Sequence, residues 1–273
     1  MASQPAPAPQ SPAATQYGPH RFATLRTTLA LILREMSTSY GRTPGGYAWA
    51  ILEPLGAIMV LSLGFSLVVR TPPLGTSFIL FYASGYMPFD LYQVLARKVS
   101  KAINFSKPLL HYPAVTWVDA VLARFILNAL TGITVTALLL TGILAVLDHR
   151  SAVDLTPVIE AMALAMLLGL AVGVMNCVLT GLFPVWDIAW SIITRPLFIA
   201  SGVFFLYDNM PPLAQQILWY NPLLHITGLM REGFYATYNA SYVNHVYVMG
   251  VSLAILTLGL ILMGRFHRTI LNS

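Results

Sequence analysis

The chain has 273 residues, of which 57% are hydrophobic and only 9% are charged. Soluble domains carry about 25% charged residues, so this composition excludes an ordinary water-soluble protein. The formal net charge is +5 at pH 7. The basic residues flank long apolar runs, where membrane topology accounts for them better than nucleic-acid binding does, so no nucleic-acid partner is expected. The composition indicates an integral membrane protein.

The N-terminal region precedes the apolar runs. Residues 1–20 are rich in Pro, Ala, Gln and Ser and predict a disordered cytoplasmic tail. Over residues 21–40, apolar side chains recur at three- and four-residue steps, with Thr27, Arg34 and Glu35 on the opposite side. This pattern predicts an amphipathic helix lying in the membrane interface, followed by a linker up to residue 46. The apolar positions are Phe22, Leu25, Leu29, Ile32, Leu33 and Met36.

The remaining residues, 47–273, contain several nearly uncharged runs of about 20 residues, the length that a helix needs to cross about 30 Å of hydrocarbon. Only helices and closed barrels satisfy their backbone in lipid, and these runs are unbroken rather than alternating. An all-α integral membrane protein with six transmembrane helices is therefore predicted. The expected spans are about 48–69, 77–96, 119–147, 157–182, 188–206 and 246–264.

Lys and Arg concentrate on one predicted side of the membrane, which places both termini in the cytoplasm. The opposite side holds only Arg70, Arg150 and Arg231. On that outer side, Leu213–Tyr220 and Leu223–Tyr235 are amphipathic and bounded by prolines, which predicts short re-entrant helices. The basic residues of the cytoplasmic side are Arg21, Arg26, Arg34, Arg42, Arg97, Lys98, Lys101, Lys107, Arg265 and Arg268.

No segment matches the phosphate-binding loop of ATPases, and no catalytic serine, metalloprotease or paired-carboxylate pattern is present. The single cysteine, Cys177, lies in an apolar run without a partner, and the histidines are scattered, so no metal site is predicted. The chain is therefore expected to be no enzyme and to bind no cofactor itself. If ATP drives it, ATP and Mg²⁺ belong to a partner subunit.

Charges inside the apolar runs point to function, because an ionised side chain at mid-membrane costs at least ~2.5 kcal/mol. Glu53 opens the first span, and Arg195 lies in the fifth, followed by the helix-loosening Pro196. Arg195 either lines a polar pathway or forms a structural salt bridge to Glu53 or Asp187, and both interpretations stay open. The substrate pathway is predicted to include Arg195, Glu53, Tyr86, Trp49 and Trp190.

Two further patterns each leave two interpretations open. Ala165, Gly169 and Gly173 form a small-residue face in the fourth span, for packing within the chain or between subunits. Aromatic side chains near the span ends form an interfacial belt, from which a few could stack on sugar rings along a pathway.

Three stretches together resemble the permease subunits of ATP-binding-cassette exporters for capsular polysaccharide, in the type-2 permease family. Residues 25–55 hold an amphipathic helix, Arg-Glu, Tyr-Gly-Arg and a Glu-Pro that opens the first span. Residues 102–124 are similar to the family's cytoplasmic loop. Residues 201–235 carry its Asn-Pro-Leu and Arg-Glu-Gly. The three stretches follow the family's order and spacing, and the resemblance covers nearly the whole chain after residue 20.

The resemblance implies a homodimer that pairs with two ATP-binding-cassette ATPase subunits. Arg26, Arg34 and Arg42 would attract the anionic headgroup of a lipid-linked polysaccharide where the N-terminal helix admits it. A periplasmic adaptor similar to polysaccharide co-polymerases and an outer-membrane polysaccharide export protein would complete the system. The loop that couples to the ATPase would include Ile103, Asn104, Phe105, Leu109, Leu110 and Tyr112.

The function implied by the resemblance is export of a lipid-linked, acidic capsular polysaccharide across the bacterial inner membrane. Export of O-antigen or of a polymer like teichoic acid is an alternative within the same class. A membrane-embedded glycan or lipid transferase is an alternative from another class, although no cluster of His or carboxylate residues supports it.

Overall fold

The computed structural model describes residues 23–40, 45–110, 112, 115–147 and 153–272. All regular structure in these residues is helical, as the all-α prediction expects, and the predicted tail 1–20 lies outside them. The elements are α1 (Ala23–Tyr40), α2 (Ala48–Val68), α3 (Phe78–Ser100), α4 (Ala102–Leu110), α5 (Trp117–Val146), α6 (Leu155–Leu182), α7 (Val185–Ala200), the 3-10 turn η1 (Tyr207–Asn209), α8 (Pro212–Leu218), α9 (Pro222–Phe234) and α10 (His245–Asn272).

Within the described residues, four helices are long and apolar enough to cross a membrane, namely α2, α5, α6 and α10. They coincide with four of the predicted spans. The second predicted span lies in α3, which carries Asp90, Arg97 and Lys98, and the fifth lies in α7, which has only 16 residues. The chain is therefore a multi-pass membrane protein, and the count of six spans stays a prediction.

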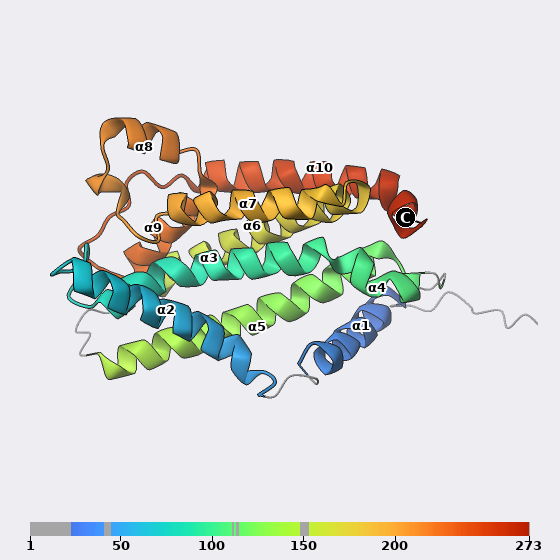
Figure 1. Cartoon of the computed structure of the whole chain (residues 1–273), viewed down its shortest axis with the longest axis horizontal. Coiled ribbons are helices and arrows are strands. Elements are labelled where there is room, and N and C mark those ends of the chain that lie inside the picture. The colour runs from blue at the N-terminus through green and yellow to red at the C-terminus, as the bar shows by residue number, and fades with distance from the viewer. Residues whose placement is uncertain (1–22, 41–44, 111, 113–114, 148–152, 273) are drawn as a thin grey trace, which may run out of the picture.

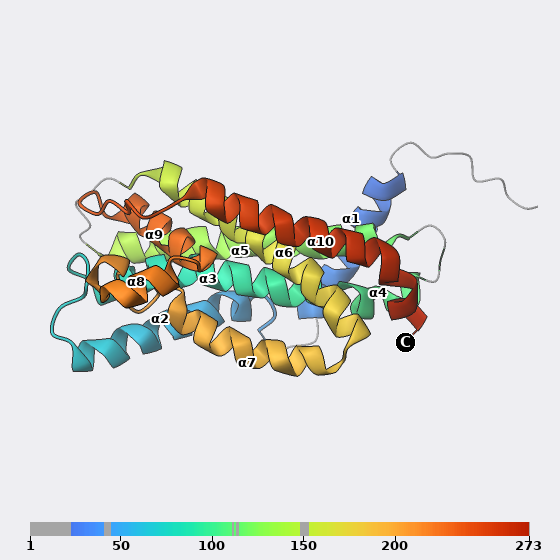
Figure 2. The same ribbon diagram turned by 90° about the horizontal axis from the view of Figure 1, so that it is seen from above.

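The long helices run back and forth along one axis of the molecule (Figures 1 and 2). The helices α1 and α4 lie at the same end as the C-terminal end of α10, whereas α8 and α9 lie at the opposite end (Figures 1 and 2). The starts of the long helices are set locally. In α5, for example, Thr116 and Asp119 form a capping box, in which each side chain accepts a backbone N–H of the other residue.

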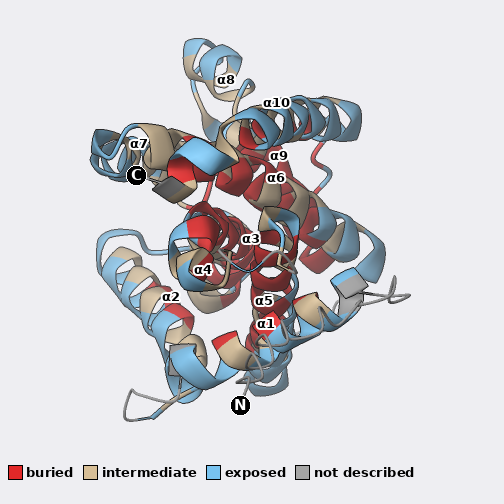
Figure 3. Cartoon of the chain, turned by 90° about the vertical axis from the view of Figure 1, so that its right-hand side faces the viewer, coloured by how far each residue is buried: buried red, intermediate tan, exposed pale blue. Residues whose placement is uncertain are grey.

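Helix α3 occupies the centre of the bundle and packs against α2, α5, α6 and α9 (Figure 3). Its contact with α6 depends on two glycines. A Cβ atom at Gly169 would lie 3.0 Å from the backbone oxygen of Tyr92, and one at Gly173 would lie 2.7 Å from Cβ of Val99. The small-residue face therefore packs within the chain, which confirms the first of its two interpretations.

The segment that follows α7 is held by Arg231 in α9, which is 2% exposed. Its guanidinium donates hydrogen bonds to the backbone oxygens of Val203 and Phe205, both at 2.9 Å, and lies over the ring of Phe81. Gly202 has φ +78°, a conformation that ends the preceding helix. The predicted span 188–206 is therefore too long at its end, because α7 stops at Ala200 and Arg231 binds the chain that follows.

Helices α8 and α9 match the two amphipathic pieces predicted on the outer side. In α9, Nε2 of His225 lies 2.7 Å from the backbone oxygen of Trp219, and the backbone N–H of Asn244 donates to Nδ1. Since Nδ1 accepts a hydrogen bond, the ring is neutral with its proton on Nε2. Burial lowers the pKa of His225, in agreement with this assignment.

The contact between α3 and α6 generates a test of the fold. Gly173→Leu forces a side chain into Val99, and such overpacking destabilises proteins by about 1–3 kcal/mol. The apparent melting temperature of the purified protein in detergent should fall. Gly142→Leu in α5 is the matched control, because its Cβ would meet no atom within 4 Å. Equal melting temperatures for the two variants would contradict the close contact.

Candidate functional site

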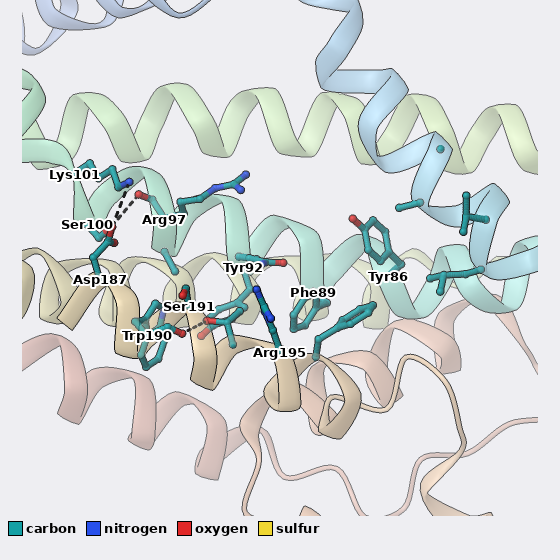
Figure 4. A pocket seen from close by; sticks show the side chains of 18 residues that line it. Tyr86, Phe89, Tyr92, Arg97, Ser100, Lys101, Asp187, Trp190, Ser191 and Arg195 are labelled. Carbon is teal, nitrogen blue, oxygen red and sulfur yellow. Dashed lines mark hydrogen bonds and ion pairs between the residues drawn. The ribbon is translucent and has the colours of Figure 1, made fainter. Parts of the chain in front are cut away.

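A cavity of about 750 Å³ lies between α2, α3 and α7 (Figure 4). It combines aromatic and charged side chains, which an apolar membrane bundle does not require for stability. Gln93, Ser191 and Thr194 add neutral polar groups. The aromatic side chains of the lining are Tyr86, Phe89, Tyr92, Trp190 and Phe198, and the charged ones are Arg97, Lys101, Asp187 and Arg195.

The aromatic wall is built around Phe198 of α7. Its ring centroid lies 4.8 Å from that of Phe89, 4.9 Å from that of Phe204 and 6.2 Å from that of Tyr86. Tilted and edge-to-face contacts of this kind add stability beyond the area that they bury. The rings of Tyr86 and Phe89 are therefore held in place, and Trp190 lies against a different ring, that of Trp186.

Arg195 lines this cavity, and Figure 4 shows it projecting from α7 toward α3. Within the described part of the chain it forms no ion pair: Asp187 pairs instead with Lys101, and Glu53 lines a different cavity. The interpretation of Arg195 as half of a salt bridge to Glu53 or Asp187 is therefore wrong. Its positive charge is left available to the cavity.

A second cavity, of about 190 Å³, lies between α2, α3 and α5. Glu53 and Trp49 line this cavity, not the first, so the structure divides the predicted pathway residues between two sites. Helix α3 separates the two cavities, and its residue Arg97 borders both of them. Tyr86 of the first cavity donates a hydrogen bond to Asp90 of the second, at 3.3 Å.

Arg124 of α5 connects the helices that meet at the end of the bundle with α1 and α4. The guanidinium of Arg124 lies 3.2 Å from the carboxylate of Glu35 in α1, and both side chains are buried. Its Nη1 donates to the backbone oxygen of Lys98, and the group lies over the ring of Phe105 in α4. Arg34 of α1 also lies over this ring. Arg124 therefore ties α1, α3 and α4 to α5.

The assignment of faces on α1 needs correction. Glu35 was expected on the solvent side of this helix, yet it is 3% exposed and faces the bundle, whereas Leu29 and Leu33 are exposed. In a membrane this arrangement is reasonable, because the outward face meets lipid and the polar face meets protein. Of the arginines predicted to attract an anionic headgroup, Arg26 is exposed, Arg34 is partly buried and Arg42 lies outside the described residues.

Helix α4 occupies the loop predicted to couple to an ATPase, but its residues face different ways. Ile103 is 1% exposed and packs against Val178 and Met263, so it is unavailable to a partner. Phe105 is partly buried against the two arginines. The residues left at the surface are Asn104 and Tyr112, with Leu109 and Leu110 half-buried.

Sequence reasoning missed several residues of the two cavities. Arg97 and Lys101 were interpreted only as topology signals, and Asp187 only as a salt-bridge partner. Asp90 could have been found by the criterion that selected Glu53, since it is a charge inside a predicted span. Among the described residues, no group of three or more His, Cys, Asp or Glu side chains is placed to hold a metal ion.

Four membrane-length helices and a polar, partly charged cavity beside α3 are features expected of a membrane transporter. The family description "ABC-2 type transporter" matches residues 26–235, and the chain therefore belongs to this family. It is a membrane subunit of an ATP-binding-cassette transporter, whose ATPase is a separate subunit, and it is not an enzyme.

Similar proteins cover almost all of the chain. The polysialic acid transport protein KpsM of Escherichia coli is 29% identical over 249 residues, which are 90% of this chain and 96% of that protein. The capsule polysaccharide export inner-membrane proteins CtrC of Neisseria meningitidis serogroup B and BexB of Haemophilus influenzae are 25% and 26% identical. They align over 88% and 89% of this chain and over 90% and 92% of their own lengths.

The buried pair of Glu35 and Arg124 generates a test of the end of the bundle that carries α1 and α4. Glu35→Gln leaves the arginine as an uncompensated buried charge and should destabilise the protein by about 3–5 kcal/mol. Replacing both members by Leu and Met should restore much of the loss, because apolar groups of similar volume often replace a buried pair without penalty.

Thermal unfolding of the full-length protein in detergent measures these effects. Arg26→Gln is the matched control, since an exposed substitution changes stability by no more than about 0.5 kcal/mol. A Glu35→Gln protein as stable as the Arg26→Gln control would show that the ion pair does not hold α1 to the bundle.

Proposed function

We propose that this chain is the membrane subunit of an exporter that moves a lipid-linked, acidic capsular polysaccharide across the bacterial inner membrane. The observation that carries the proposal is the cavity between α2, α3 and α7. Aromatic rings offer flat apolar surfaces to the C–H faces of sugars. Among the described lining residues, Arg97, Lys101 and Arg195 outnumber the one carboxylate, Asp187, and favour an anionic ligand. The names of the similar proteins agree with such a substrate.

In this proposal the chain crosses the membrane six times, with α3 and α7 as the additional spans. The 23 residues of α3 extend about 35 Å, which is enough to cross the hydrocarbon. Its charged groups are covered by neighbouring helices or border the two cavities, where protein and water replace lipid. The basic residues around α1, α4 and the end of α10 support the proposal that this end, with both termini, lies in the cytoplasm.

A second copy of the chain would complete the pathway. Helices α2 and α7 flank the main cavity, and both expose large apolar side chains, among them Val60, Leu67 and Ile192. Two copies facing each other across these helices would enclose the cavities of both subunits in one channel. Such a closed point-group arrangement is the usual form of a homo-oligomer.

The cytoplasmic end would meet the motor. Two ATPase subunits, which bind ATP and Mg²⁺, would contact α4 through Asn104, Tyr112 and the half-buried Leu109 and Leu110. Helix α1 would admit the lipid-linked polysaccharide, with Arg26, Arg34 and Arg42 near its anionic headgroup. A periplasmic adaptor and an outer-membrane export protein would receive the polymer on the other side.

Co-purification tests the assignment as an exporter. The tagged chain, expressed from its natural gene neighbourhood, should bring down an ATP-binding-cassette ATPase in a 1:1 ratio. Inverted vesicles that contain both subunits should accumulate lipid-linked glycan only when ATP is supplied. A protein that purifies without an ATPase, from vesicles that move no glycan, would overturn the proposal.

Substitutions in the main cavity test the proposed pathway. Arg195→Ala should lower export about tenfold, because the loss of one hydrogen bond to a charged ligand corresponds to about 1.5 kcal/mol. Trp190→Ala should lower export by removing a stacking surface, and Glu53→Gln tests the smaller cavity separately.

Surface glycan per cell, divided by the amount of exporter in the membrane, is the measurement. Arg268→Ala is the matched control, since this arginine is exposed on α10 and lines neither cavity. Export at the control level in both Arg195→Ala and Glu53→Gln cells would show that the pathway lies elsewhere.

A further inference from the structure

An ion pair spans one end of the main cavity, where Nζ of Lys101 lies 3.8 Å from Oδ2 of Asp187 (Figure 4). Lys101 is the residue between α3 and α4, and Asp187 lies in the first turn of α7. Both residues line the cavity, at the end opposite Tyr86 (Figure 4). The pair therefore bridges two of the three helices that form the site.

This ion pair is poorly suited to a structural role. The two side chains are 53% and 54% exposed, and exposed pairs contribute little to stability because water screens them. The separation of 3.8 Å also exceeds the 2.7–2.9 Å typical of a charge-assisted hydrogen bond. Among its described residues α7 has none that is fully buried, and the start of this helix is held to α6 by the hydrogen bond that Nε1 of Trp186 donates to Oδ1 of Asn176, so it does not depend on the ion pair.

The surroundings of the pair favour an anion. Arg97 and Arg195 line the same cavity, and Asp187 is the only carboxylate among the described lining residues. The hydroxyl of Ser191 and the ring of Trp190 lie on the same side, from α7. An anionic group that enters this end of the cavity would therefore meet an excess of positive charge and a single competing carboxylate.

We propose that Lys101 is the centre of an anion subsite, and that Asp187 occupies it as an internal substitute until a carboxylate or phosphate of the substrate displaces it. This inference rests on the proposed function, since it names a subsite for the glycan. When an anion of the substrate takes the place of the Asp187 carboxylate, Lys101 has an anionic partner both before and after the exchange. Because the internal pair is weak, the substrate anion replaces it easily. Lys101 directly precedes α4, so the exchange takes place beside the segment proposed to contact the ATPase.

The subsite predicts opposite effects for the two members of the pair. Lys101→Gln removes the cation and should weaken binding of an anionic ligand about fivefold, whereas Asp187→Asn removes the competitor and should strengthen it by up to about fivefold. Lys101→Arg keeps the charge and should bind like the unmodified protein. A merely structural pair predicts instead that both single substitutions have the same effect.

The measurement is fluorescence polarisation of a labelled trimer of sialic acid on the full-length protein in lipid nanodiscs. Neutral labelled maltotriose is the control ligand, and its binding should not change between variants. Inorganic phosphate, added as a competitor, distinguishes the source of the anion. Displacement of the trimer by phosphate at low concentration indicates a headgroup phosphate, and resistance indicates a sugar carboxylate, both within the proposed subsite.

Equal changes in the Lys101→Gln and Asp187→Asn proteins would overturn the subsite, as would the absence of trimer binding to the unmodified protein. Melting temperatures of each variant, measured in the same nanodiscs, show that the binding changes do not arise from unfolding. The proposed export function is tested independently, because co-purification of an ATPase and ATP-dependent glycan movement are both measured on the unmodified protein, without any substitution at Lys101.

Discussion

The polar groups of α3 must be kept away from lipid, and the rest of the structure depends on this constraint. This helix carries Asp90, Arg97 and Lys98 within a membrane bundle, where an exposed charge is strongly unfavourable. Helices α2, α5, α6 and α9 therefore pack around it, and the glycines of α6 bring two backbones close together. Where the packing leaves space, two cavities form on either side of α3, and its polar side chains face them.

Two buried arginines hold the ends of this bundle. Arg231 binds the backbone oxygens that follow α7 and so fixes that segment, while Arg124 joins α1 and α4 to the opposite end of the bundle. Each of these guanidinium groups lies over an aromatic ring and donates to a backbone oxygen, so it is stabilised without direct contact with water. The middle of the bundle, between these anchors, contains the less tightly packed α2 and α7.

A tightly packed core combined with two less tightly packed helices suits a transporter. The main cavity lies between buried α3 and two helices, α2 and α7, that both expose large apolar side chains. Its charged groups are Asp187 and Arg195 on α7, and Arg97 and Lys101 in and directly after the last turn of α3. Helices that bury few side chains can shift while the rest of the fold stays intact, which is what the proposed substrate pathway requires of α2 and α7.

The amino-acid sequence by itself determined the membrane class, the helical fold, the approximate positions of the long helices and the family, because apolar run length and local motifs are read along the chain. It also placed Arg195, Tyr86 and Trp190 in one site. Only the tertiary structure decided that Glu53 and Trp49 face another cavity, that Glu35 turns inward to Arg124, and that Lys101 meets Asp187. These facts depend on which helices become neighbours and how each is rotated about its axis, and periodicity along one helix contains neither quantity.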